Sequence, residues 1–173
     1  MKLTRTLGLS VLALFFSASS QATELSISVE IPALNVAEYH RPYLAVWIED
    51  SNSKTVSNLA VWYETKLRNN EGEDWLKDMR QWWRKSGRSL TMPIDGVTGA
   101  THGPGKYDLN FKLGAAPLAK LADGEYTLRI EAAREVGGRE LLDIPFSLPA
   151  KASVTAKAQG NSELGEVLLS IKP

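Results

Sequence analysis

Residues 43–48 read Tyr-Leu-Ala-Val-Trp-Ile, and residues 59–63 read Leu-Ala-Val-Trp-Tyr. Both runs are apolar and rich in β-branched and aromatic residues, and the polar residues 49–54 separate them. Two runs of this composition on either side of a turn segment predict a β-hairpin. Because side chains alternate between the faces of a strand, apolar residues in an unbroken run lie on both faces. The hairpin is therefore predicted to need packing partners on both sides.

The alternation also predicts which side chains of the second strand share a face. Leu59, Val61 and Tyr63 should lie on one face, and Ala60 and Trp62 on the other. Residues 73–85 follow this strand and contain neither Gly nor Pro. They begin with acidic residues and end with basic ones, which is typical of an α-helix.

The apolar residues of this predicted helix recur at helical spacing: Trp75, Met79, Trp82 and Trp83. A stripe at this spacing usually faces a core. We expect it to pack against the second face of the hairpin, near Trp47 and Trp62. The alternative is an exposed aromatic stripe that meets a partner or a membrane surface.

Strand-like patterns continue on both sides of the hairpin and the helix. Residues 24–31 alternate strictly between apolar and polar side chains, as a half-buried strand does. Further strand-like runs cover residues 106–113, 124–135, 139–148, 154–158 and 166–171, with Asp-Gly and Gly-Gly turn signals between some of them. Short strands at such intervals favour a mainly β fold, an antiparallel immunoglobulin-like β-sandwich with one inserted Trp-rich α-helix.

Residues 1–22 have the layout of a secretory signal peptide. Lys2 and Arg5 precede the apolar residues 7–16, and residues 17–22, which are small except for Gln21, follow. The apolar run is too short to span a bilayer, so we predict cleavage after Ala22, with an uncleaved N-terminal anchor as the alternative. Residues 23–173 are then expected to form a single exported β-sandwich domain that does not span the membrane.

Composition narrows the function classes. The chain has 20 Lys and Arg and 20 Asp and Glu, and removal of the signal leaves 18 against 20, a formal charge of −2. Nucleic-acid binding needs a basic surface, so nucleic acid is not an expected partner. The chain has no cysteine and two histidines, which leaves neither disulfides nor a predicted metal site. The common motifs of hydrolases and nucleotide-binding enzymes are missing, so no catalytic residues are assigned.

The sharpest functional signal lies in residues 91–105, a stretch with four glycines and two prolines that is predicted to be a shaped loop. Its residues 95–101 read Asp-Gly-Val-Thr-Gly-Ala-Thr and fit the pattern Asp-x-x-(Ser/Thr)-Gly-Ala-(Ser/Thr). This segment resembles the acceptor motif of flavinylated proteins. In those proteins an exported FAD:protein FMN transferase attaches FMN through a phosphodiester to the final Ser or Thr.

The resemblance implies a role for each position of the candidate cofactor-binding segment: Asp95, Thr98, Gly99, Ala100, Thr101 and His102. Thr101 would be the acceptor, with its hydroxyl exposed for the transferase. Asp95 would help the transferase position the loop, and Gly99 and Ala100 would leave room beside the hydroxyl. The attached flavin could stack on His102 or on the tryptophans of residues 75–83. In the alternative, the segment is an ordinary turn in which Asp95 caps backbone amides and His102 is a polar loop residue.

Four segments, residues 41–50, 75–83, 95–105 and 131–140, resemble the family called domain of unknown function 2271, and the resemblance extends over residues 27–148. It implies a periplasmic protein of envelope electron transfer, with the flavin transferase and a PepSY-type membrane protein as partners. The runner-up is a non-catalytic periplasmic binding module without a cofactor. An enzyme, the third possibility, would need a pocket where Asp95, His102 and Glu131 meet.

Overall fold

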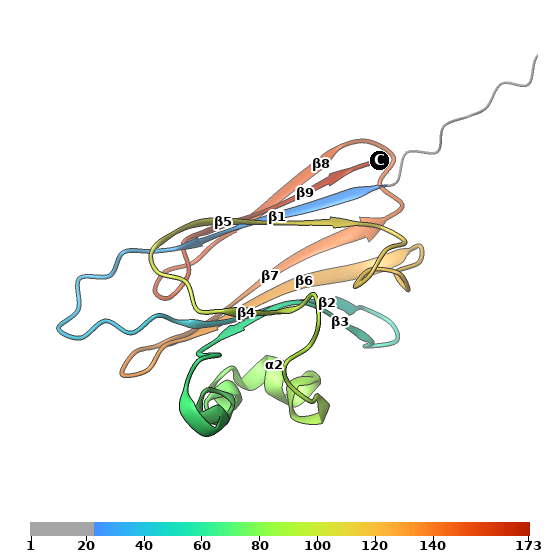
Figure 1. Cartoon of the computed structure of the whole chain (residues 1–173). Coiled ribbons are helices and arrows are strands. Elements are labelled where there is room, and N and C mark those ends of the chain that lie inside the picture. Colours follow the sequence, from blue (N-terminus) through green and yellow to red (C-terminus); the bar gives the residue numbers. More distant parts are fainter. Residues whose placement is uncertain (1–22) are drawn as a thin grey trace, which may run out of the picture.

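The structure is a computed structural model that describes residues 23–173, and the predicted signal peptide lies outside them. Two β-sheets pack face to face, and short helices form a third layer on the outer side of one sheet (Figure 1). The prediction of a mainly β sandwich with an inserted Trp-rich helical segment is confirmed.

The first sheet has four antiparallel strands in the order β5-β1-β9-β8. Its members are β1 (Glu24–Ile31), β5 (Gly105–Lys112), β8 (Val154–Gln159) and β9 (Glu166–Lys172). In β1 the alternate residues Leu25, Ile27, Val29 and Ile31 are buried, as the pattern predicts. This sheet therefore covers the core with one face and meets solvent with the other.

The second sheet has five strands in the order β4-β3-β2-β6-β7. They are β2 (Tyr43–Asp50), β3 (Val56–Tyr63), β4 (Thr98–Ala100), β6 (Gly124–Ala133) and β7 (Arg139–Leu148). The predicted hairpins β2-β3 and β6-β7 are both present. The short strand β4 pairs in parallel with β3, whereas the other pairs of the sheet are antiparallel.

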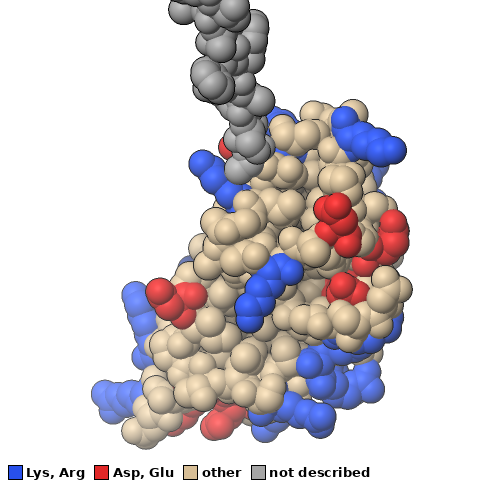
Figure 2. All heavy atoms as spheres, turned by 90° about the vertical axis from the view of Figure 1, so that its right-hand side faces the viewer, with Lys and Arg blue, Asp and Glu red and all other residues tan. Residues whose placement is uncertain are grey.

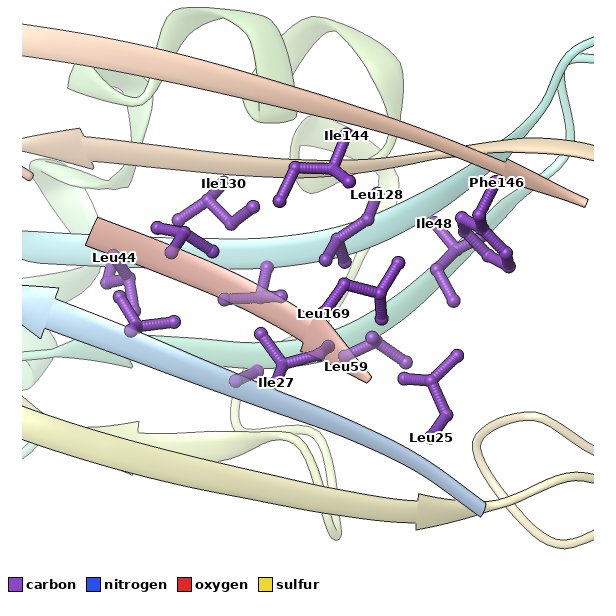
Figure 3. Packing of buried hydrophobic residues seen from close by; sticks show 14 of the residues in the cluster. Leu25, Ile27, Leu44, Ile48, Leu59, Leu128, Ile130, Ile144, Phe146 and Leu169 are labelled. Carbon is purple, nitrogen blue, oxygen red and sulfur yellow. The ribbon is translucent and has the colours of Figure 1, made fainter. Parts of the chain in front are cut away.

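The main core fills the space between the two sheets (Figure 3). Aliphatic side chains from both sheets interdigitate there, among them Leu25, Ile27, Leu44, Ile130 and Leu169. Closely packed aliphatic residues exclude water and supply most of the stabilising free energy of such a fold. A chain without cysteine depends on this burial.

A β-bulge in the β2-β3 hairpin changes the predicted faces. Val46 pairs with Ala60, whereas the next residue, Trp47, pairs with Asn58, so Leu59 is the extra residue. Leu59 therefore joins the core between the sheets, and the prediction that it shares a face with Val61 is wrong.

Trp62 also lies on the opposite side of the sheet from the one expected. It pairs directly with Leu44, and residues opposite each other on paired strands share a face. Trp62 thus packs into the core between the sheets, and its predicted contact with the helical layer is wrong. Trp47 does face that layer, as predicted.

The helical layer is a chain of short pieces: η1 (Arg68–Asn70), α1 (Glu71–Asp74), η2 (Leu76–Asp78), α2 (Arg80–Lys85) and η3 (Gly87–Ser89). A continuous helix over residues 73–85 was the expectation, and it is wrong. Met79 interrupts the helix with φ −77° and ψ 72°, outside the helical region. The carboxylate of Glu131 accepts hydrogen bonds from the amides of Gln81 and Trp82, and so takes the place of backbone partners at the start of α2.

The break in the helix changes which side chains are buried. Leu76, Met79 and Trp82, spaced by three residues, are fully buried and pack on the outer face of the second sheet with Trp47. Core packing is thus confirmed for Met79 and Trp82. Trp75 is instead 50% exposed, because the 3-10 turn η2 directs Leu76 toward the sheet in its place.

Figure 2 shows the end of the molecule that lies at the right of Figure 1. Basic and acidic side chains form separate small groups there among uncharged residues. Among residues 23–173, none of the helices combines the length and the apolar character needed to cross a bilayer.

Candidate functional site

The motif of residues 95–101 is held by the edge strand β4. A turn precedes the strand, in which the amides of Val97 and Thr98 both donate to the carbonyl oxygen of Ile94. Gly96 adopts φ +68° in this turn, a conformation that favours glycine. The expectation that residues 91–105 lack regular structure is wrong at β4, because its pairing with β3 joins residues far apart in sequence.

The Trp62 ring leaves no room for a side chain at Gly99. Gly99 pairs with Trp62 across the β3-β4 ladder, and a Cβ atom added to Gly99 would lie 2.9 Å from Cδ1 of the indole ring. Real Cβ atoms do not approach other atoms so closely. The glycine therefore lets the motif lie flat against Trp62.

Thr101 directly follows β4, and its side chain is held in place. It is 5% exposed, and its hydroxyl Oγ1 donates a hydrogen bond to Oε1 of Glu64 over 2.5 Å. Glu64 directly follows β3, so the parallel pairing of the two strands brings both residues to the same point. The expectation that the Thr101 hydroxyl is exposed is therefore wrong. The arrangement in which Glu64 binds this buried hydroxyl is called the closed form below.

Of the remaining motif side chains, one forms a hydrogen bond within the turn before β4 and others are exposed. Thr98 Oγ1 accepts a hydrogen bond of 2.8 Å from the amide of Ile94 and so closes the turn. Ala100 and Asp95 are exposed. No amide of residues 23–173 donates to the carboxylate of Asp95 in the structure, which does not support the alternative that Asp95 caps the turn.

His102 belongs to an aromatic cluster on the side of the second sheet that faces the core. Its ring centroid lies 4.4 Å from that of Trp62 and 4.5 Å from that of Tyr107. Tyr107 is fixed in turn by a hydrogen bond of 2.9 Å from its hydroxyl to the carbonyl oxygen of Gly103. Two aromatic neighbours thus already pack against the His102 ring.

A cavity of about 270 Å³ lies between the end of the second sheet and the helical layer. Its lining includes aromatic, aliphatic, basic and acidic side chains: Arg41, Tyr43, Glu64, Leu67, Trp75 and Arg134. Burial raises the pKa of Tyr43, although a hydrogen bond with the backbone of Glu64 lowers it in part, so the phenol stays protonated at neutral pH. Glu64 contacts Thr101 and also lines this cavity.

The family model described as "Predicted periplasmic protein (DUF2271)" matches residues 24–166. The chain belongs to this family. The match agrees with the resemblance found in the sequence, and it places the protein in the periplasm. No curated protein and no solved structure shows a significant match to the chain.

The DUF2271 domain does not bring together Asp95, His102 and Glu131, the residues that the enzyme hypothesis needs in one pocket. Glu131 is fully buried and is bound by the amides at the start of α2 and by Arg139, with 2.7 Å between Nη1 and Oε1. Glu131 therefore binds groups of α2 and β7 and does not meet Asp95 and His102 in a pocket. His102 packs on Trp62 instead, and no metal-binding group of three or more His, Asp or Glu occurs in the described part of the chain.

Sequence analysis identified Thr101 but missed Glu64. Glu64 lies 37 residues earlier in the chain, and no local pattern marks it as a partner of the threonine. The only signal in the sequence at Glu64 is that it directly follows the apolar run of residues 59–63. The parallel pairing of β3 with β4, which makes the contact, depends on tertiary packing.

Proposed function

We propose that this DUF2271 protein is a periplasmic flavin carrier, with FMN attached to Thr101 through a phosphodiester, and that it takes part in electron transfer across the envelope. The observation that carries the proposal is the complete acceptor motif ending in a threonine whose hydroxyl is bound to a carboxylate. FMN, when bound, accepts and releases electrons. The protein itself supplies the attachment point and the surroundings of the flavin.

The attachment step transfers the FMN half of FAD to Thr101, and AMP is the leaving group. Thr101 Oγ1 attacks the phosphorus of the FMN half of FAD, so an Oγ1–P bond forms and the P–O bond to AMP breaks. AMP leaves, and the hydroxyl proton must pass to a base. The Glu64 carboxylate holds this hydroxyl in the closed form, and a base of the transferase would receive the proton once the loop has entered its active site. The FAD:protein FMN transferase would bind FAD and the loop together.

Access for the transferase requires that the edge of the sheet open locally. β4 has three residues and pairs with β3 alone in its sheet. A short edge strand held by few hydrogen bonds opens at a lower free-energy cost than the central strands. Opening of β4 would carry Thr101 away from Glu64 and expose Oγ1, and Asp95 is exposed even in the closed form.

The fit of a flavin to this site rests on three features of the chain. The hydroxyl is present at the required motif position, a carboxylate binds it, and the residue that carries this carboxylate also lines a cavity with aromatic side chains in its wall. A PepSY-type membrane protein would exchange electrons with the attached flavin. The alternative, a periplasmic binding module without a cofactor, would use the same loop for docking alone.

Intact mass of the protein after co-production with a periplasmic FAD:protein FMN transferase tests this function. We expect the mass to rise by one FMN less one water in the wild type and in Thr101→Ser, which keeps a hydroxyl. Thr101→Val has nearly the same shape but no hydroxyl, so it should remain unmodified. If the wild type stays unmodified while a known acceptor is modified in the same cells, the carrier proposal is wrong and the binding module is favoured.

A further inference from the structure

We propose that the cavity between the end of the second sheet and the helical layer binds the isoalloxazine ring of the flavin attached to Thr101, with Trp75 as a stacking surface. This inference rests on the proposed function, because it needs the flavin to be attached at Thr101. It assigns the cavity of about 270 Å³ as the second half of the same site.

Glu64 connects the attachment point to the cavity. Its carboxylate accepts the hydrogen bond of the Thr101 hydroxyl at 2.5 Å, and Glu64 is also one of the residues that line the cavity. A phosphate on Oγ1 therefore starts next to the cavity wall. The ribityl chain of FMN is flexible and joins the phosphate to the ring, so the ring can reach the cavity from an attachment point beside Glu64. The tether also raises the effective concentration of the ring at the cavity.

The walls of the cavity match the chemistry of isoalloxazine. This ring system is planar, with an apolar benzenoid side and a polar pyrimidine side that carries hydrogen-bond donors and acceptors. Tyr43, Leu67 and Trp75 supply apolar surface, and Arg41 supplies donors. A volume of about 270 Å³ is just below the usual range for a whole small-molecule site, which suits the ring portion of a larger ligand.

Two unusual features lie at this cavity. Trp75 is 50% exposed, whereas Trp47 and Trp82 of the adjoining cluster are fully buried. The Nη1 atom of Arg134 is buried without a hydrogen-bond partner in the described structure. A large exposed aromatic residue on the wall of a cavity is typical of a binding site rather than of a core.

The aromatic cluster around His102 is a poorer place for the ring. Trp62 is 6% exposed, and its indole packs against both His102 and Tyr107, with centroid distances of 4.4 and 5.6 Å. A flavin could stack there only by displacing a ring that is already packed. The cavity offers open volume and an exposed tryptophan at no such cost.

Flavin fluorescence tests the assignment, because a stacked tryptophan quenches an isoalloxazine ring by contact. The proteins to compare are the flavin-loaded wild type, Trp75→Leu and Leu67→Arg, each with its flavin content measured by intact mass. Trp83→Leu is the matched control, since Trp83 lies in the same layer but does not line the cavity. Trp75 and Leu67 are both exposed enough that their replacement should leave the fold intact.

We expect the wild type and Trp83→Leu to show quenched flavin fluorescence. Trp75→Leu should fluoresce several-fold more per attached flavin, and Leu67→Arg should fluoresce more as well. Equal fluorescence in all four proteins, each with its flavin attached, would overturn the cavity assignment and leave the carrier function standing. Absence of any flavin mass on the wild type would overturn both proposals.

Discussion

The Thr101 hydroxyl and the Glu64 carboxylate, 37 residues apart in sequence, form a hydrogen bond of 2.5 Å at the ends of two parallel strands. We predict that this bond couples the two residues in a double-mutant cycle of Thr101→Val and Glu64→Ala. Hydrogen bonds to charged groups stabilise by about 1.5–3 kcal/mol, and partial exposure of Glu64 favours a coupling of about 1.5 kcal/mol. Urea unfolding of the four proteins measures it. Additive losses would show that the bond does not form in solution.

Gly99 should not tolerate a methyl group, because the added Cβ would lie 2.9 Å from the Trp62 ring. Gly99→Ala is expected to destabilise the protein by about 1–3 kcal/mol, the usual cost of overpacking, and to speed amide exchange in β4. Gly103→Ala is the matched control, since no atom lies within 4 Å of its added Cβ. Equal stability of the two variants in urea would contradict the packing of β4 on Trp62.

Glu131 is predicted to hold the helical layer on the second sheet. Its buried carboxylate accepts from the amides of Gln81 and Trp82 and from Arg139. Glu131→Ala leaves these donors without a partner and should cost about 3 kcal/mol of unfolding free energy. Glu131→Gln keeps one acceptor oxygen and should lose clearly less, as measured by chemical denaturation. The same loss in both variants would argue against a role of the amide contacts.

Glu140 should make stability depend on acid pH. Burial tends to raise the pKa of Glu140, but hydrogen bonds from the backbone amides of Asn161, Leu164 and Ser162 outweigh it and lower the pKa below its ordinary value. A depressed pKa in the folded state gives stability that is complete above the unfolded pKa and is lost as pH falls through the folded value. Below about pH 4.5 the unfolding free energy of wild type should therefore fall more steeply than that of Glu140→Gln. If the unfolding free energies of the two proteins change with pH in the same way, these hydrogen bonds do not lower the pKa of Glu140.

The strands were predictable from the sequence because alternation and turn residues are local signals. Eight of the nine strands, all but β4, coincide with predicted runs. Features that depend on contacts between distant segments were not predictable. The bulge at Leu59 is a property of the pairing between two strands, and the break at Met79 reflects the tertiary contact of Glu131 with α2.

The candidate site was predictable only in part for the same reason. The motif marks Thr101, but its partner Glu64 and the cavity with Trp75 come from segments that only the fold brings together. A broken helix exposes Trp75, whereas a continuous helix would have buried it. Local pattern therefore indicates the attachment point, and tertiary structure supplies its surroundings.

Asp95 offers a test that separates recognition by the transferase from stability of the fold. Its side chain is exposed, and Asp95-Gly96 forms a turn before β4. Asp95→Asn should leave the unfolding free energy within about 0.5 kcal/mol of wild type, as surface substitutions do. If the carboxylate helps the transferase position the loop, the rate of FMN attachment, followed by intact mass, should fall several-fold.

Asp123→Asn is the control for this prediction, since Asp123 is also exposed and also precedes a glycine, Gly124, at the start of β6. It should change neither the stability nor the rate of attachment. Equal attachment rates in Asp95→Asn and wild type would mean that the transferase does not use the Asp95 carboxylate. A large loss of stability in Asp95→Asn would instead show that the aspartate serves the turn, because a carboxylate that only meets another protein contributes little to folding.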